Sequence, residues 1–287
     1  MSNFRITTDS SCDLPQALAS QLNVTVFPLT FTIEDKEYAN SEGLSEKEFY
    51  DKLRRGAMPK TSAMSMESCM EGLRPYLENG EDILHIAFSS GLSCTYTNAR
   101  LAGEELQKEF PDRKIIVIDS LCASLGQGLL VYYAALARDA GKTIDEVAAE
   151  VNVKIPQLAH WFTVDDLFHL KRGGRVSAAV AIAGSLLAIK PVMHVDDAGK
   201  LIKVTTARGR KASIAALLEQ MKKTAIAPET QTVFISHGDC EEDAEKLASM
   251  IKDTWGVKDV VIGYVGPVIG AHSGAGTLAL FFLGSER

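Results

Sequence analysis

A chain of 287 residues is long for a single hydrophobic core, so we expect two domains. Its net charge of −7 argues against general nucleic-acid binding, which needs a basic surface that neutralises phosphates. The five cysteines are scattered and form no CxxC pair, which argues against a disulfide framework or a zinc site and predicts reduced thiols in a cytoplasmic protein. The N-terminus also lacks the charged-then-apolar pattern of a secretory signal.

The first half of the chain alternates short apolar segments with helical patterns. In order, we expect a strand at 4–8, a helix at 14–22, β-structure at 24–33, a helix at 45–55, a loop at 58–63, a helix at 66–77, a strand at 82–88, a helix at 96–110, a strand at 114–118, and helices at 123–140 and 144–154. Ser45 and Glu48 form a capping-box pattern at the start of one helix. Strands alternating with helices of this length predict a largely parallel sheet flanked by helices.

The second half has shorter elements and a hairpin pattern. We expect a short helix at 165–171, an apolar helix at 176–189, hairpin strands at 192–195 and 201–205, a helix at 211–223, a strand at 232–236, a helix at 241–254, a strand at 260–265, a Gly-rich loop at 266–276 and a strand at 278–283. The apolar segment 176–189 is too short to span a bilayer. The fold prediction is therefore α/β, with an N-terminal α/β domain over 1–162 and a C-terminal α+β domain over 163–287.

Three predicted strands of the first half end in loops that carry hydroxyl or acidic residues. These loops are Asp9-Ser10-Ser11, Ser89 to Thr95 and Asp119-Ser120. Helix capping explains each one alone, but the second holds more hydroxyls than one cap needs. Ligands in open α/β sheets sit outside the carboxyl ends of the strands. Because no Lys or Arg occurs from Ser89 to Asn98, this loop predicts a neutral cradle for a carboxylate or carbonyl.

His272 is the most informative polar residue of the second half. It lies in a segment with three neighbouring glycines, where backbone can approach a ligand closely, although a hydrogen-bonded structural role is the simpler explanation. Ser93, Asp119 and His272 follow the chain order of an α/β-hydrolase triad, which leaves a serine hydrolase as an alternative function. Against it, 91–95 (GLSCT) lacks the last glycine of the GxSxG elbow. No histidine spacing indicates a metal site.

Two basic clusters occur in this acidic chain. Lys171-Arg172-Gly173-Gly174-Arg175 follows a predicted helix, and Arg208, Arg210 and Lys211 form the second cluster. Favourable charge at a helix C-terminus explains the first cluster. Together the clusters could equally form a docking face for an acidic partner or a membrane surface.

Six motifs together resemble the DegV family over essentially the whole chain. They are TDSSCDL at 8–14, KTS at 60–62, SSGLS at 89–93, LKRGGR at 170–175, IKP at 189–191 and GAHSG at 270–274. The resemblance implies two domains with a long-chain fatty acid held between them. For some members it implies a fatty-acid-binding subunit of a bacterial fatty acid kinase. In that system a separate ATP-dependent subunit, similar to dihydroxyacetone kinase, converts the carboxyl to acyl phosphate for phospholipid synthesis.

The same resemblance assigns roles to individual residues. The carboxylate would be bound by Thr61, Ser62, Ser93 and Thr95, with His272 close by. Arg172, Arg175 and Arg208 would meet the kinase subunit or a membrane surface. The family implies a fatty acid as ligand and no catalytic residue, metal or other cofactor. The chain departs from the common family sequence at Ala63-Met64 and at Cys94.

Two further interpretations stay open at this point. A regulatory lipid sensor would bind the same ligand but act on another partner. The apolar segment 176–189 could line the tunnel for the acyl chain or form ordinary core.

Overall fold

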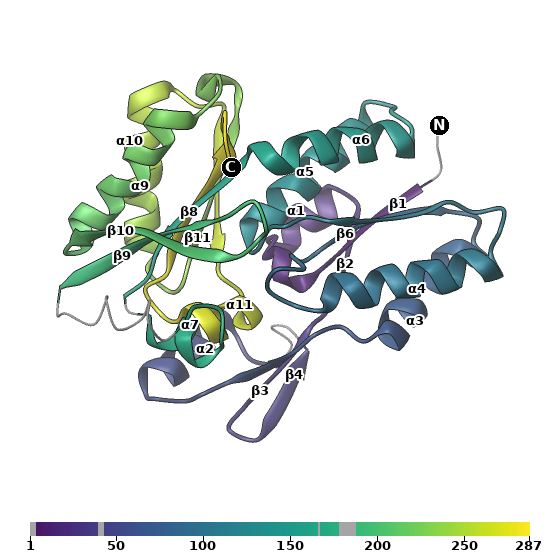
Figure 1. Cartoon of the computed structure of the whole chain (residues 1–287), viewed down its shortest axis with the longest axis horizontal. Helices are drawn as coiled ribbons and strands as arrows, with labels where there is room; N and C mark the ends of the chain where they lie inside the picture. The colour runs from purple at the N-terminus through teal and green to yellow at the C-terminus, as the bar shows by residue number, and fades with distance from the viewer. Residues whose placement is uncertain (1–3, 40–42, 166, 178–187) are drawn as a thin grey trace.

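Three β-sheets organise the part of the chain that the computed structural model describes, residues 4–39, 43–165, 167–177 and 188–287 (Figure 1). The first is a parallel sheet of four strands in the order β2-β1-β6-β7. Its strands are β1 (Phe4–Asp9), β2 (Val24–Phe27), β6 (Asp82–Ala87) and β7 (Ile115–Asp119). Helices α3 (Met66–Glu78) and α4 (Thr95–Glu109) cover one face, and α5 (Leu125–Asp139) and α6 (Ile144–Lys154) cover the other. The predicted helix-flanked parallel sheet is confirmed.

The second sheet has six strands in the order β10-β9-β8-β13-β11-β12 and mixes parallel and antiparallel pairs. Its strands are β8 (Leu158–Thr163), β9 (Ile189–Val195), β10 (Leu201–Arg208), β11 (Thr232–His237), β12 (Asp259–Tyr264) and β13 (Leu278–Leu283). Helices α9 (Arg210–Thr224) and α10 (Glu241–Trp255) pack on its outer face. The sequence had predicted no strand at β8, which crosses the boundary expected at residue 162 and pairs entirely within this second sheet.

The third sheet is small and antiparallel, with the order β4-β3-β5. It consists of β3 (Thr30–Ile33), β4 (Lys36–Ala39) and β5 (Lys60–Ser62). The β-structure expected at 24–33 divides at Pro28, which has no backbone N–H to give to a ladder, so β2 and β3 enter different sheets. The loop expected at 58–63 is wrong in its centre, because residues 60–62 pair with β3 and place Thr61 opposite Phe31.

Four shorter helices complete the described chain. They are α1 (Gln16–Gln21), α2 (Glu46–Arg54), α7 (Phe168–Arg172) and α11 (Pro267–Ser273), with 3₁₀ turns at Ser10–Cys12, Ile155–Gln157 and Pro228–Thr230. The predicted capping box starts α2: the Ser45 hydroxyl accepts from the Glu48 amide, and the Glu48 carboxylate accepts from the Ser45 amide at 3.0 Å. The apolar helix expected at 176–189 falls largely on 178–187, outside the described residues, and Ile189 begins β9 instead.

Helix α11 corrects the Gly-rich loop expected at 266–276. Pro267 opens the helix, at a position where its missing N–H costs nothing. Gly270 lies inside the helix, and a Cβ there would come within 2.6 Å of the Tyr50 hydroxyl oxygen. This glycine therefore serves close packing between α11 and α2 rather than chain flexibility. Because α11 carries His272, that packing fixes the position of the histidine.

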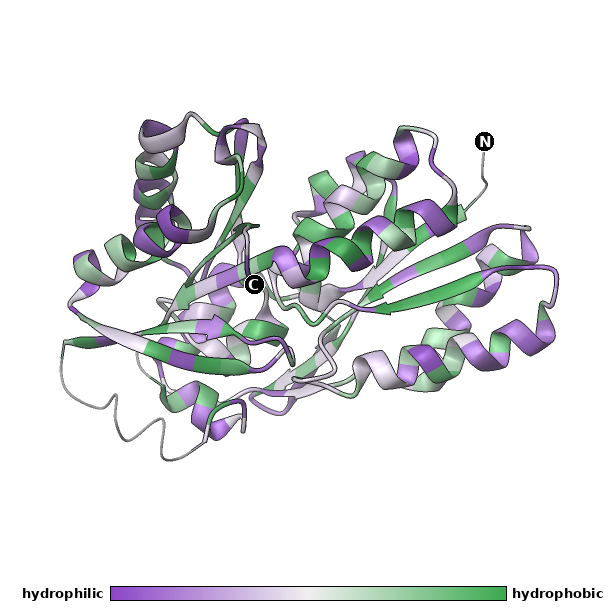
Figure 2. Cartoon of the chain, turned by 45° about the horizontal axis from the view of Figure 1, so that its top comes forward, coloured by the Kyte–Doolittle hydropathy of each residue, from purple (hydrophilic) through white to green (hydrophobic). Residues whose placement is uncertain are grey.

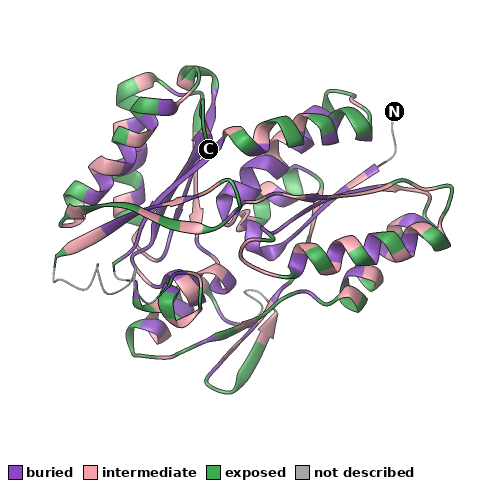
Figure 3. Cartoon of the chain, in the orientation of Figure 1, coloured by how far each residue is buried: buried purple, intermediate pink, exposed green. Residues whose placement is uncertain are grey.

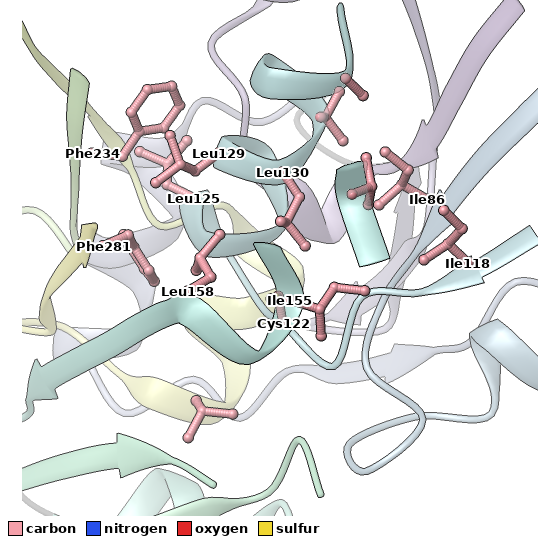
Figure 4. Packing of buried hydrophobic residues seen from close by; sticks show 14 of the residues in the cluster. Ile86, Ile118, Cys122, Leu125, Leu129, Leu130, Ile155, Leu158, Phe234 and Phe281 are labelled. Carbon is pink, nitrogen blue, oxygen red and sulfur yellow. The ribbon is translucent and has the colours of Figure 1, made fainter. Parts of the chain in front are cut away.

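Helix α5 joins the two larger sheets through one continuous core. Its buried side chains contact Ile86 on the four-stranded side and Phe234 on the six-stranded side. Figure 4 shows Leu129 beside Phe234, with Leu130 between these residues and Ile86. Each fully buried leucine of this kind contributes about 1.5–3 kcal/mol of transfer free energy. The two sheets are thus held against opposite sides of one helix.

Hydropathy and burial follow the same layers. Figure 2 shows hydrophobic residues concentrated on the strands of the two larger sheets, and Figure 3 shows exposed residues gathered on the outer faces of the helices. Within the described part of the chain, no helix combines the length and apolar character needed to cross a bilayer.

Candidate functional site

A cavity of about 1010 Å³, counting its open mouth, lies where the two larger sheets meet α11. Most of its wall is apolar, including Phe88, Phe162, Leu170, Val195, Val268 and Phe281. The cavity therefore suits a ligand whose surface is largely hydrocarbon.

One part of the wall is polar and contains all five residues expected to bind a carboxylate. These residues are Thr61, Ser62, Ser93, Thr95 and His272. The Thr61 Oγ1 atom lies 2.8 Å from His272 Nε2, and Ser93 Oγ lies 3.0 Å from Thr95 Oγ1. The Thr95 amide also donates to Ser93 Oγ at 3.2 Å. The structure thus brings together residues from β5, the β6–α4 loop and α11.

Backbone contacts fix the β6–α4 loop in this place. The Ser93 amide donates to the Ser89 carbonyl at 3.1 Å, which turns the chain sharply after β6. The Asn98 side-chain amide donates to the Met64 carbonyl at 2.7 Å and ties the first turn of α4 to the segment after β5. Ser93 and Thr61 are therefore positioned by a direct link between their two segments. Cys94 lies exposed beside them and lines the cavity as well.

His272 is held as a neutral imidazole. Burial, with a smaller contribution from the charges of Arg175 and Arg172, lowers its pKa from 6.5 to about 4. Its Nε2 atom contacts Thr61, while its Nδ1 atom is buried and has no hydrogen-bond partner in the described part of the chain. A Cβ at Gly173 would come within 2.2 Å of that Nδ1 atom. Glycine in the LKRGGR motif thus leaves the space that the histidine ring occupies.

The three arginines expected at a docking surface lie in different environments. Arg208 is exposed. Arg172 is half-buried and donates from Nη2 to the Ala271 carbonyl at 2.9 Å, next to His272. Arg175 is also half-buried, lines the cavity and donates from Nη2 to the Leu92 carbonyl at 3.1 Å. A docking role for them stays a prediction.

Arg175 also changes the expected electrostatics of the site. The absence of Lys and Arg from 89–98 had predicted a cradle without a cation, but Arg175 brings one into the cavity wall from the second half of the chain. The position of Arg175 in the cavity wall could not be predicted from the sequence, because spacing along the chain carries no information about its contact with Leu92. A positive charge here favours a negatively charged ligand group.

The hydrogen bonds do not form a catalytic triad. Asp119 Oδ1 accepts from the amides of Ser90 and Leu121, both at 3.1 Å, and so stabilises two loops. His272 contacts Thr61 through Nε2, and no carboxylate of the described residues orients its Nδ1 atom. A serine nucleophile needs a base that is itself oriented by a third group. The geometry therefore does not favour the hydrolase alternative.

The other polar strand ends have structural roles. Asp9 is fully buried, and its carboxylate accepts from the Phe88 amide at 2.8 Å and from the Gln127 side chain at 3.2 Å.

Among the described residues, no group of three or more His, Cys, Asp or Glu side chains is arranged to hold a metal ion.

Five further polar residues of the cavity wall were not predicted from the sequence: Ser124, His160, Ser236, Ser273 and Thr277. Ser236 lies near the carboxyl end of a predicted strand, which is a usable signal for a ligand site. His160 lies in a strand that was not predicted, and Ser124 precedes α5 with no pattern of its own.

Comparisons with known proteins agree on one family. A family model described as "Uncharacterised protein, DegV family" matches residues 3–285. A DegV domain-containing protein of Clostridium perfringens is 47% identical over 289 aligned residues, covering 100% of this chain and 99% of the relative.

Solved structures agree with that match. The fold is similar to a fatty-acid-binding DegV family protein of Thermus thermophilus, with a TM-score of 0.88, 31% identity, and 97% and 98% of the two chains covered. It is also similar to DegV, a fatty acid binding protein from Bacillus subtilis, with a TM-score of 0.85, 27% identity, and 98% and 99% covered.

The lowered pKa of His272 predicts a specific pH dependence. The folded state binds this proton near pH 4, whereas the ordinary value is 6.5, so the unfolded chain holds more protons between these values. The free energy of unfolding should therefore fall as the pH drops from about 6.5 to about 4. The His272→Gln variant should lose less stability than the wild type over that window, measured by urea unfolding at several pH values. An NMR titration that places His272 near 6.5 would contradict the assignment.

Proposed function

The chain belongs to the DegV family, and from this premise we propose that it binds a long-chain fatty acid and carries it for a separate kinase subunit. The observation that carries this proposal is the group of hydroxyls around Thr61 and Ser93, which lies in the wall of a largely apolar cavity. Relatives of similar fold that are 27% and 31% identical are fatty-acid-binding proteins, which supports the same ligand class.

The polar wall can donate several hydrogen bonds to a carboxylate. In the tautomer with its proton on Nε2, His272 donates to Thr61 Oγ1, so the Thr61 proton is free to point at the ligand. Ser93 and Thr95 share one hydrogen bond between their hydroxyls, which leaves one further proton for the ligand. Hydrogen bonds to an ionised acceptor are short and strong. The nearby charge of Arg175 adds to this attraction.

The apolar wall supplies most of the affinity. Burying about 15 methylene groups at roughly 0.8 kcal/mol each contributes on the order of 12 kcal/mol. Immobilising the ligand and ordering its chain offset part of this gain. A dissociation constant between micromolar and nanomolar follows.

The finer proposal is that the protein is a non-catalytic, cytoplasmic subunit. His272 has a pKa near 4 and no orienting carboxylate, so it is poorly suited to act as a base at neutral pH. The carboxylate would be bound and presented to an ATP-dependent subunit similar to dihydroxyacetone kinase, which would form the acyl phosphate. Exposed Arg208 is the best candidate for contact with that subunit or transiently with a membrane surface. A regulatory sensor would share the ligand but give no acyl phosphate.

Native mass spectrometry tests the ligand directly. Protein expressed in bacteria should carry an added mass equal to one long-chain fatty acid, because the cavity buries the ligand on most sides. Extraction and gas chromatography would identify the acid. A mass equal to the bare chain, together with no binding in a calorimetric titration, would reject the proposal.

Removing one hydroxyl tests the carboxylate site. Ser93→Ala should weaken fatty-acid binding by about 1–3 kcal/mol, because an acceptor on the ligand loses its donor. Ser90→Ala is the matched control: it lies in the same loop, is exposed and does not line the cavity. Titration calorimetry on delipidated protein measures both. Equal affinity of the two variants would remove Ser93 from the site.

Charge reversal tests the docking surface. Arg208→Glu should keep fatty-acid affinity within about twofold but lower acyl phosphate formation with the kinase subunit and ATP, since the change lies on an exposed face. Lys223→Glu makes the same charge change on the outer helix α9 and should leave the rate unaltered. Similar rates for both variants would place the contact elsewhere.

A further inference from the structure

The cavity has a second polar cluster, formed by Ser124, Ser236 and His160, apart from the carboxylate wall. Ser124 precedes α5, Ser236 lies in β11 and His160 lies in β8, and all three line the cavity. Their neighbours in the wall include Ala279 and Phe281 of β13. A cavity shaped only for a hydrocarbon chain has no need of these groups.

The Ser236 hydroxyl oxygen can accept a further hydrogen bond. Ser124 Oγ lies 2.5 Å from Asp13 Oδ2, and burial raises the pKa of Asp13 to about 8, so either group can supply the proton of that bond. Ser236 Oγ lies 3.0 Å from Ser124 Oγ, and either hydroxyl can be the donor in that pair. In both directions this bond leaves Ser236 Oγ with at least one unused lone pair, and full burial keeps bulk water away from it.

His160 offers a second acceptor. Its Nδ1 atom lies 3.0 Å from the Leu158 carbonyl oxygen, which can only accept, so Nδ1 carries the proton. Burial holds the pKa of His160 well below its usual value, and the ring is neutral. Nε2 is then an acceptor, and it is buried without a partner among the described residues. A Cβ at Gly126 would come within 2.1 Å of this atom, so a glycine is required for the ring to fit.

The strand register places both acceptors on the cavity face of the second sheet. Ser236 pairs with Ala279, and His160 pairs with Phe281. Ala279 and Phe281 are two residues apart on β13, so their side chains point to the same face. Both residues line the cavity. Ser236 and His160 therefore face the cavity from β11 and β8, the two strands on either side of β13.

We propose that the cavity prefers a long-chain fatty acid that carries a hydroxyl group on its hydrocarbon chain. The hydroxyl proton is donated to Ser236 or to His160. This inference rests on the proposed fatty-acid binding. A plain methylene at the same place leaves a buried acceptor without a donor, which is unfavourable. Sites built to hydrogen-bond a hydroxyl discriminate strongly against the analogue that lacks it.

The test compares stearic acid with monohydroxylated stearic acids whose hydroxyl occupies successive positions along the chain. Titration calorimetry on delipidated wild-type protein should show at least one hydroxylated isomer binding about tenfold more tightly than stearic acid, the ratio expected from one satisfied buried acceptor. Ser236→Ala or His160→Phe should abolish that preference while stearic acid still binds. Ser213→Ala removes a buried hydroxyl on α9, outside the cavity, and should preserve the preference.

The outcomes distinguish the hydroxyl preference from the fatty-acid binding on which it rests. If stearic acid binds as tightly as every hydroxylated isomer, the hydroxyl preference is wrong and fatty-acid binding stands. If the preferred isomer keeps its advantage in both Ser236→Ala and His160→Phe, the assignment of the acceptors is wrong. If no acid binds to the wild type, the proposed function itself fails.

Discussion

The buried carboxylate of Asp9 is the interaction on which the site depends. It lies at the end of β1 and accepts from the Ser11 amide at 3.1 Å, the Phe88 amide at 2.8 Å and the Gln127 side chain at 3.2 Å. Burial raises its pKa despite these bonds, which shows that desolvation is the largest contribution. One side chain therefore joins the ends of β1 and β6 to α5. Phe88 begins the segment that carries Ser93. Loss of this carboxylate would therefore free that segment, which forms part of the cavity wall.

Helix α5 extends that constraint across the molecule. Its buried face packs on both large sheets, so the cavity between them keeps its width only while the helix stays in place. The segment before the helix contributes Ser124 to the cavity wall, and Gln127 on its first turn contacts Asp9. Close packing explains Gly126 as well, because a side chain there would collide with His160. Helix α5 thus both supports the two sheets and positions part of the cavity wall. Substitution of a buried residue in α5 is therefore expected to alter ligand binding as well as stability.

Sequence patterns predicted the elements whose signal is local. The strand at 82–88 followed by hydroxyls, and the capping box of Ser45, are such cases. The errors occur where tertiary contacts decide. Residues 60–62 have no apolar alternation and become a strand only by pairing with β3. The segment around Gly270 was predicted as loop from its glycines, whereas packing against Tyr50 makes it a helix. Family resemblance pointed to Thr61, but the cavity contact of Arg175 could not be inferred from any spacing.

The properties of His272 and Arg175 favour binding of an anion in the cavity over catalysis of a reaction of that anion. A general base must be able to take up a proton near neutral pH, and two neighbouring arginines and burial move the pKa of His272 away from that range. The same features favour a negatively charged carboxylate, because the neutral histidine donates to Thr61 in the tautomer with its proton on Nε2, while Arg175 supplies positive charge nearby. Under the proposed function, such a site would hold the fatty acid as its carboxylate. The ionised carboxylate oxygen is the nucleophile that a phosphoryl donor requires, so the proposed kinase subunit would receive the ligand in its reactive form.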